Sequence, residues 1–164
     1  MDDPAGEIEK VAVLLMAAVN PEIQKAAVLK YYTPDVSFRH PFCTVPSAPN
    51  SREALLAILQ WYRVLSPKLV VHMRSATFDR DTNDLYLDAE QDFHIRWSPF
   101  RAAPSRFLIH LKLRPTQEPS EGTTLYQIAS QEDFYHPEDL AALLMPRSCP
   151  SSTSSFAPAR SSAG

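Results

Sequence analysis

The sequence predicts an α+β fold in which three helices pack on one face of a curved antiparallel sheet. Two observations predict it. Apolar residues recur at helical spacing up to about residue 65, and the spacing changes to strict alternation after Pro67. In residues 85–97 one face is apolar and the other is charged, so only one face of the sheet has to be covered by helices.

The first two helices are expected to be antiparallel neighbours. Residues 7 to 20 form the first, because apolar side chains repeat along one side of it: Ile8, Val11, Leu15 and Val19. Asn20 followed by Pro21 is typical of an N-cap with proline at the first helical position. The second helix therefore opens there, and it must end before Pro34.

The third helix and the sheet follow in order. Asn50 and Glu53 have the spacing of a capping box, and the helix that they open ends at Pro67. A short strand precedes this helix, and four long strands follow it, over residues 68–79, 84–97, 106–114 and 123–136. A short last helix is expected from Pro137.

The strand at residues 84–97 shows the alternation most clearly. Its apolar face reads Leu85, Leu87, Ala89, Gln91, Phe93, Ile95 and Trp97, and the other face is mostly acidic. If residues 106–114 return antiparallel, Phe107 lies opposite Trp97, and the basic side chains lie opposite the acidic ones. We therefore interpret the charged face as solvated and held by cross-strand ion pairs. His72, His94 and His110 belong to this face at no metal-ligand spacing, so no metal is expected.

Composition limits the class of protein. The chain has 164 residues, of which 45% are hydrophobic and 21% charged, which suits one soluble domain. Its formal net charge of −3 offers no basic surplus, so no nucleic-acid partner is expected. Cys43 and Cys149 are too few for a disulfide framework, and the acidic N-terminus does not resemble a signal peptide. An intracellular, cytoplasmic protein is expected.

Two segments are expected along the chain. Residues 1–145 form the folded domain. Residues 146–164 are rich in serine and proline and have too little apolar content to form a core, so a disordered tail is expected there.

The order of elements carries a resemblance. With AAVN at the end of the first helix and YYTPDVSFRHPF entering the first strand, residues 7–145 resemble the nuclear-transport-factor-like superfamily, which includes ketosteroid isomerases and SnoaL-like polyketide cyclases. The pieces WYRVLSP, QDFHIRWSPF and YQIASQEDFYHPEDL are most similar to a fungal SigF-like subgroup. The resemblance implies a cone-shaped sheet that encloses an apolar pocket and places the first strand beside the last.

The same resemblance points to His40. In ketosteroid isomerases the general base is a carboxylate directly before a proline in a segment of this shape, and the matching residue here is His40 before Pro41. On the last strand the even positions continue the apolar face, which directs Glu132 inward. His40 is then a candidate base oriented by Glu132. The alternative is a buried structural histidine. Cys43, three residues further along an extended segment, is expected on the opposite face.

The oxyanion donors of the isomerases have no counterpart. The matching position on the first helix is Leu15, and residues 106–114 point only apolar side chains inward. Gln91 is the polar exception on its strand, and it requires a ligand or a partner such as Tyr126. The candidate ligand-binding residues are therefore Tyr62, Gln91, Phe93, Trp97 and Tyr126, although side chains such as Tyr62 and Trp97 more often belong to a core.

Three functions remain open on these grounds. The leading one is a pocket, used without a cofactor, that binds a small hydrophobic molecule. The second is a cofactor-independent isomerase, cyclase or dehydratase with His40 as its base. The third is a non-catalytic module that forms a homodimer through the sheet or docks a partner. The fold alone does not choose among them.

Overall fold

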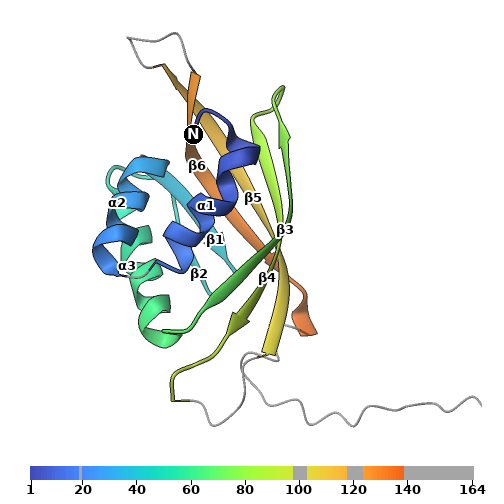
Figure 1. Cartoon of the computed structure of the whole chain (residues 1–164). Coiled ribbons are helices and arrows are strands. Elements are labelled where there is room, and N and C mark those ends of the chain that lie inside the picture. The colour runs from blue at the N-terminus through green and yellow to red at the C-terminus, as the bar shows by residue number, and fades with distance from the viewer. Residues whose placement is uncertain (19, 98–102, 118–123, 139–164) are drawn as a thin grey trace, which may run out of the picture.

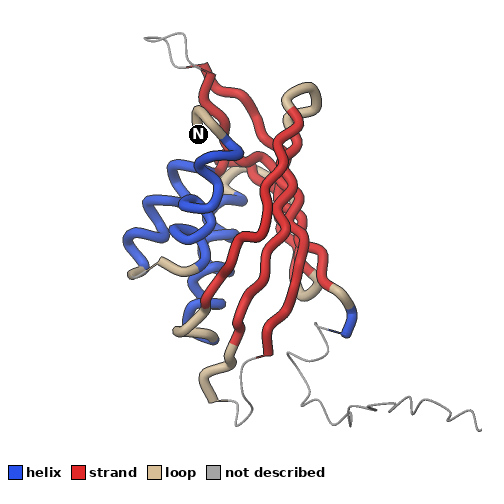
Figure 2. The backbone as a smooth tube through the Cα atoms, turned by 45° about the vertical axis from the view of Figure 1, so that its right-hand side comes forward, coloured by secondary structure: helices blue, strands red, loops and turns tan. Residues whose placement is uncertain are grey.

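The molecule has two layers, a helical layer and a strongly curved sheet (Figures 1 and 2). The computed structural model describes residues 1–18, 20–97, 103–117 and 124–138. The helices are α1 (Pro4–Met16), α2 (Pro21–Tyr31) and α3 (Ser51–Leu65). The strands are β1 (Tyr32–His40), β2 (Cys43–Val45), β3 (Val70–Asp79), β4 (Asp84–Phe93), β5 (Ala103–Gln117) and β6 (Thr124–Tyr135). The predicted α+β arrangement is confirmed.

The six strands lie in the order β2-β1-β6-β5-β4-β3. β1 runs parallel to β6, and every other neighbouring pair is antiparallel. The first strand thus lies beside the last, as the resemblance implied. The core between the layers contains the largest fully buried side chains, among them Tyr32, Phe38, Phe107, Leu55, Leu85 and Leu87.

The helix starts match the expected signals only in part. The Asn20 side chain accepts a hydrogen bond from the backbone N–H of Ile23 at 2.9 Å, which confirms the N-cap of α2. Asn50 instead takes a left-handed conformation with φ 67°, and its side chain makes no cap bond. The expected capping box is therefore wrong: the backbone N–H of Glu53 donates to the backbone oxygen of Asn50, at 3.0 Å.

The pairing of β4 with β5 differs from the expected register. Phe107 lies opposite Ala89, not opposite Trp97. The reason is that β4 ends at Phe93, after which the backbone bonds to the end of α3: the N–H of Arg96 donates to the Leu65 carbonyl at 2.8 Å. The displacement is an even number of residues, so every side chain keeps its expected face.

The charged outer face of the sheet is held by cross-strand ion pairs, as expected. Arg106 binds Asp88 through two hydrogen bonds of 2.8 and 2.6 Å. Asp84 accepts from Lys112 at 3.1 Å and lies 2.8 Å from His110 Nε2, while Arg74 pairs with Glu90.

We expect such exposed pairs to contribute little to stability. Replacing Glu90 by alanine removes the 3.2 Å contact with Arg74, and the free energy of unfolding should change by roughly 1 kcal/mol or less. Urea denaturation measures this change. A folded Glu90→Ala variant that no longer bound a ligand in the cavity would contradict the interpretation of this face as purely structural.

One irregularity in β6 has consequences for the site. Ser130 pairs with Lys112 and Ile128 pairs with Leu113, so Ala129 is an extra residue in β6. Before this bulge the even position Ile128 is fully buried, and after it the odd positions Gln131 and Asp133 are buried. The bulge therefore exchanges the two faces of the strand.

Some expectations fall on residues that are not described. The tail predicted for residues 146–164 lies outside the described residues, as does the helix predicted from Pro137 beyond its first two residues. No helix in the described part of the chain combines the length and apolar character that a membrane crossing requires.

Candidate functional site

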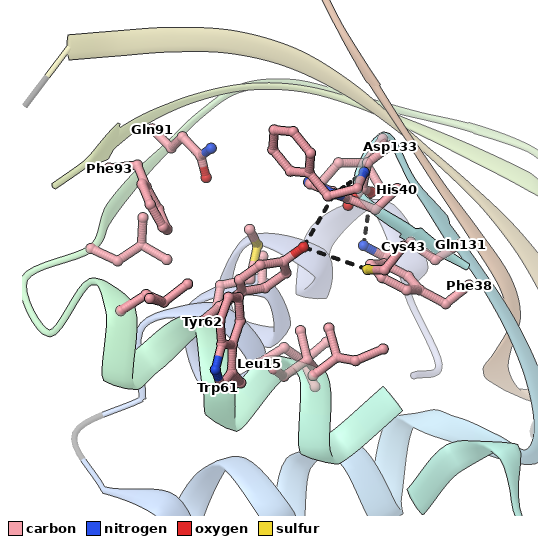
Figure 3. Close-up of a pocket in the computed structure, with 18 of the residues that line it drawn as sticks. Leu15, Phe38, His40, Cys43, Trp61, Tyr62, Gln91, Phe93, Gln131 and Asp133 are labelled. Carbon is pink, nitrogen blue, oxygen red and sulfur yellow. Dashed lines mark hydrogen bonds between the residues drawn. The ribbon is translucent and has the colours of Figure 1, made fainter. Parts of the chain in front are cut away.

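A cavity of about 650 Å³ lies between the helices and the sheet. α1, α3 and the strands β1, β2, β4, β5 and β6 all contribute to its walls. Apolar side chains dominate the lining, including Ile8, Leu15, Phe38, Ile58, Leu87 and Ile109. Figure 3 shows polar side chains gathered toward one part of this cavity, around His40 and Asp133.

Four of the five predicted ligand-binding residues line the cavity: Tyr62, Gln91, Phe93 and Trp97. Tyr126 is not part of the lining. Its ring packs edge-on against Phe78, with 5.4 Å between the ring centres, and its backbone bonds to Met1. The expected place for Tyr126 is wrong because of its position along β6: it lies near the start of the strand, whereas the polar residues of the cavity lie near its end, from Gln131 to Tyr135.

Glu132 points away from the cavity and pairs with Arg39, with 3.2 Å between the charged atoms. The expectation that Glu132 faces inward and orients His40 is therefore wrong. Its cause is the same bulge, because counting even positions from Ile128 gives the wrong face beyond Ala129.

Asp133 takes the inward position and lines the cavity with only 8% of its surface exposed. Its Oδ1 accepts a hydrogen bond of 2.8 Å from Gln131 Nε2. The Tyr32 hydroxyl donates to Oε1 of the same amide, which fixes the Gln131 side chain with its N–H groups toward Asp133. Burial raises the pKa of Asp133 to about 7, although the bond from Gln131 opposes the shift.

His40 lines the same cavity and is held as a neutral ring. The backbone N–H of Phe42 donates to Nδ1 at 3.3 Å, so Nδ1 carries the lone pair and Nε2 the proton. The Tyr62 hydroxyl lies 3.2 Å from the same nitrogen and donates to it as well. Burial lowers the pKa of His40 to about 4. Among the described residues none accepts a hydrogen bond from Nε2.

Cys43 belongs to the same cluster, contrary to expectation. Its Sγ lies 3.6 Å from the Tyr62 hydroxyl, and it lines the cavity beside His40. The chain turns at Pro41 and Phe42, so His40 and Cys43 are cross-strand partners in a hairpin. The expectation of opposite faces is wrong because it assumed one continuous extended segment.

Gln91 finds its partner on β6. Its Nε2 donates to the Tyr135 hydroxyl at 3.1 Å, not to Tyr126. The Tyr135 ring stacks on Phe107 and meets the His40 ring edge-on, with centres 5.2 Å apart. The polar groups of the cavity therefore extend from Gln91 through Tyr135 to His40.

Asp133 is the residue that the sequence analysis missed. The alternation of Gln131, Asp133 and Tyr135 is visible in the sequence, but it points inward only if the strand contains a bulge. Within the described ranges no group of three or more His, Cys, Asp or Glu side chains is arranged to hold a metal ion.

The solved structures similar to this chain have the same fold. One is a hypothetical protein with a ketosteroid isomerase-like fold from Catenulispora acidiphila, in complex with trimethylamine. Its sequence is 16% identical and the TM-score is 0.61, and the match covers 85% of this chain and 92% of that one. Another, from a Jannaschia species, is described as a putative SnoaL-like polyketide cyclase; it is 15% identical with a TM-score of 0.61, over 89% of this chain and 94% of that one. Identities this low show the fold alone.

The evidence for family membership comes from the amino-acid sequence. A comparison with proteins of curated function found no match. The family model of the SigF NTF2-like domain, in contrast, matches residues 1–157. Because this match spans nearly the whole chain, and the helices, sheet and cavity agree with the fold, the chain belongs to the SigF NTF2-like domain family.

Proposed function

We propose that this protein binds a small, largely apolar molecule that carries an acceptor oxygen, such as a carbonyl. The cavity is the observation that carries the proposal, because about 650 Å³ with apolar walls is within the range of small-molecule sites. The described polar groups favour an acceptor oxygen, since His40 presents an N–H at Nε2 and Asp133 presents an O–H when protonated.

Filling the cavity should abolish this binding. Ile58 lines the cavity from α3, and Ile58→Trp places a larger ring in its space. We expect affinity for an apolar fluorescent probe, anilinonaphthalene sulfonate, to fall by roughly 100-fold or more, because a displaced ligand loses most of its buried area. Fluorescence titration of the purified protein measures it.

Val64→Trp is the matched control, since Val64 lies on the same helix and is exposed outside the cavity lining. Equal affinity of both variants for the probe would contradict the proposal. Mass spectrometry of the protein under native conditions, compared with the Ile58→Trp variant, would then show directly whether a small molecule is retained.

Asp133 supports a second candidate function, proton transfer on the bound molecule. A carboxyl group with a pKa of about 7 exchanges its proton readily at neutral pH. In this version Asp133 accepts the proton, and the neutral His40 ring donates a hydrogen bond to the oxygen on which charge develops. His40 as the base stays a prediction, but a nitrogen that already accepts two hydrogen bonds supports it less well.

The predicted homodimer also remains a proposal. The outer face of the sheet exposes Tyr86, Leu108 and Phe134 between its ion pairs. These side chains are apolar enough to contribute to an interface between two copies, and sedimentation of the purified protein tests it.

A further inference from the structure

Three aromatic side chains of the cavity lining are also exposed, so they lie where the cavity meets solvent. Phe42, Trp61 and Trp97 are 50%, 58% and 67% exposed, and all three belong to the cavity lining. We call this group the aromatic rim. Large aromatic side chains are normally buried, so a set of them around one opening indicates a surface that meets something apolar.

The rim is held in place by the backbone. Phe42 lies in the turn between β1 and β2, and Trp61 lies on α3, where its ring contacts Tyr62 with centres 5.8 Å apart (Figure 3). Trp97 follows Arg96, whose N–H donates to the last residue of α3, Leu65, at 2.8 Å.

Basic side chains accompany the rim. Lys68, in the turn after α3, and Arg96, beside Trp97, are both exposed. The nearest acidic residue on β4, Asp92, alternates with Gln91 and so faces the outer side of the sheet. Arg39, near Phe42, is already neutralised by Glu132. The edge around the opening is therefore locally cationic in a chain whose formal net charge is −3.

We propose that the aromatic rim docks on an anionic lipid surface, from which the apolar molecule enters the cavity. Tryptophan favours the boundary between headgroups and acyl chains, and lysine and arginine next to it attract anionic lipid. A protein bound here would cover the opening, whereas a lipid surface is itself a reservoir of apolar molecules. This last step rests on the proposed function of the cavity.

The chain contains its own reporter for this docking. Its two tryptophans are Trp61 and Trp97, and both are in the rim. On adding vesicles of phosphatidylcholine and phosphatidylserine in equal parts, we expect tryptophan emission to shift to shorter wavelength and brominated lipid to quench it. Vesicles of phosphatidylcholine alone should give a much weaker response. Flotation of the protein with the vesicles measures binding independently.

Two variants that keep both tryptophans sharpen the test. Phe42→Ser removes a rim side chain, and Phe134→Ser removes a phenylalanine of similar exposure, 47%, on the outer face of the sheet. We expect binding to anionic vesicles to fall several-fold in the first and to stay unchanged in the second. Lys68→Glu should lower the partition coefficient by roughly tenfold or more, because it reverses one charge near the surface.

Unchanged emission and no flotation with either vesicle would overturn the proposal. So would a concentration-dependent dimer in sedimentation that Phe42→Ser disrupts without any response to vesicles, since the rim would then be an interface between two copies. Binding of anilinonaphthalene sulfonate in the absence of vesicles tests the cavity by itself. Its persistence in Lys68→Glu therefore separates a failure of docking from a failure of the proposed function.

Discussion

Replacing Asp133 by asparagine is expected to stabilise the protein above about pH 7. The folded state holds the pKa of this carboxyl at about 7, against 3.8 for an ordinary aspartate. Asp133 therefore favours folding while it is protonated in the folded state, and this contribution is lost as pH rises through about 7. The asparagine side chain would keep the acceptor for Gln131 without ever carrying the charge.

The size of the effect follows from the shift in pKa. A difference of about three units corresponds to roughly 4 kcal/mol in the free energy of unfolding at pH 8, and the gain should vanish near pH 4. Urea denaturation at several pH values measures it. Asp88→Asn is a control of opposite sign, because the salt bridge with Arg106 lowers the pKa of Asp88, and its removal should destabilise the protein at neutral pH.

In the wild-type protein His40 changes stability with pH in the direction opposite to Asp133. Burial lowers the pKa of His40 from 6.5 to about 4. Between these pH values His40 is protonated in the unfolded chain but neutral in the folded protein, so the stability of the folded state falls as pH drops from 6.5 to about 4. Over this window the two contributions offset each other, and wild-type stability should be nearly flat. In Asp133→Asn it should rise with pH. Parallel profiles for the two proteins would show that Asp133 is ionised normally.

Loss of turnover in the same variant is the second large effect expected. If the cavity catalyses proton transfer, Asp133→Asn should lower the rate by roughly 100-fold or more, the usual contribution of a general base. His40→Gln keeps an N–H donor but loses the ring that positions it, so it should lower the rate by about tenfold at most, the worth of one hydrogen bond if the amide fails to reach the substrate. The wild-type rate should rise with pH through about 7, as Asp133 loses its proton.

A screen of enones, polyketide-like ketones and terpenoid lactones provides the assay, with proton exchange into deuterated solvent as the readout. The opposite ranking of the two variants would make His40 the base and restore the hypothesis drawn from its position before Pro41. Turnover that survives in both variants would exclude a catalytic role for the described cluster. Binding without any exchange would leave the protein as a carrier.

Asp133→Asn therefore tests two properties of Asp133 at once, its effect on stability and its role in proton transfer. The same substitution is expected to raise stability at neutral pH and to remove proton transfer. A buried carboxyl that costs stability is typical of a functional site, because a packed core alone would select an apolar or neutral side chain there. The combination of both results would be hard to explain by a structural role.

Local pattern in the sequence determined which segments are helices, which are strands, and which face of each regular strand is buried. Asn20 before Pro21 marked the start of α2, and the alternation from Leu85 to Phe93 was sufficient to predict the inward set of β4. These features depend on neighbours within a few residues, which the sequence displays directly. The family resemblance supplied what pattern alone did not, the pairing of β1 with β6.

Tertiary structure decided which polar side chains meet around His40 in the cavity. The bulge at Ala129 is visible only in the pairing of β6 with its neighbours, and it places Glu132 outward and Asp133 inward. The hairpin at Pro41 likewise brought Cys43 beside His40. Side-chain direction in a strand has a period of two residues, so one extra residue reverses every assignment after it, and no local pattern records where that residue is inserted.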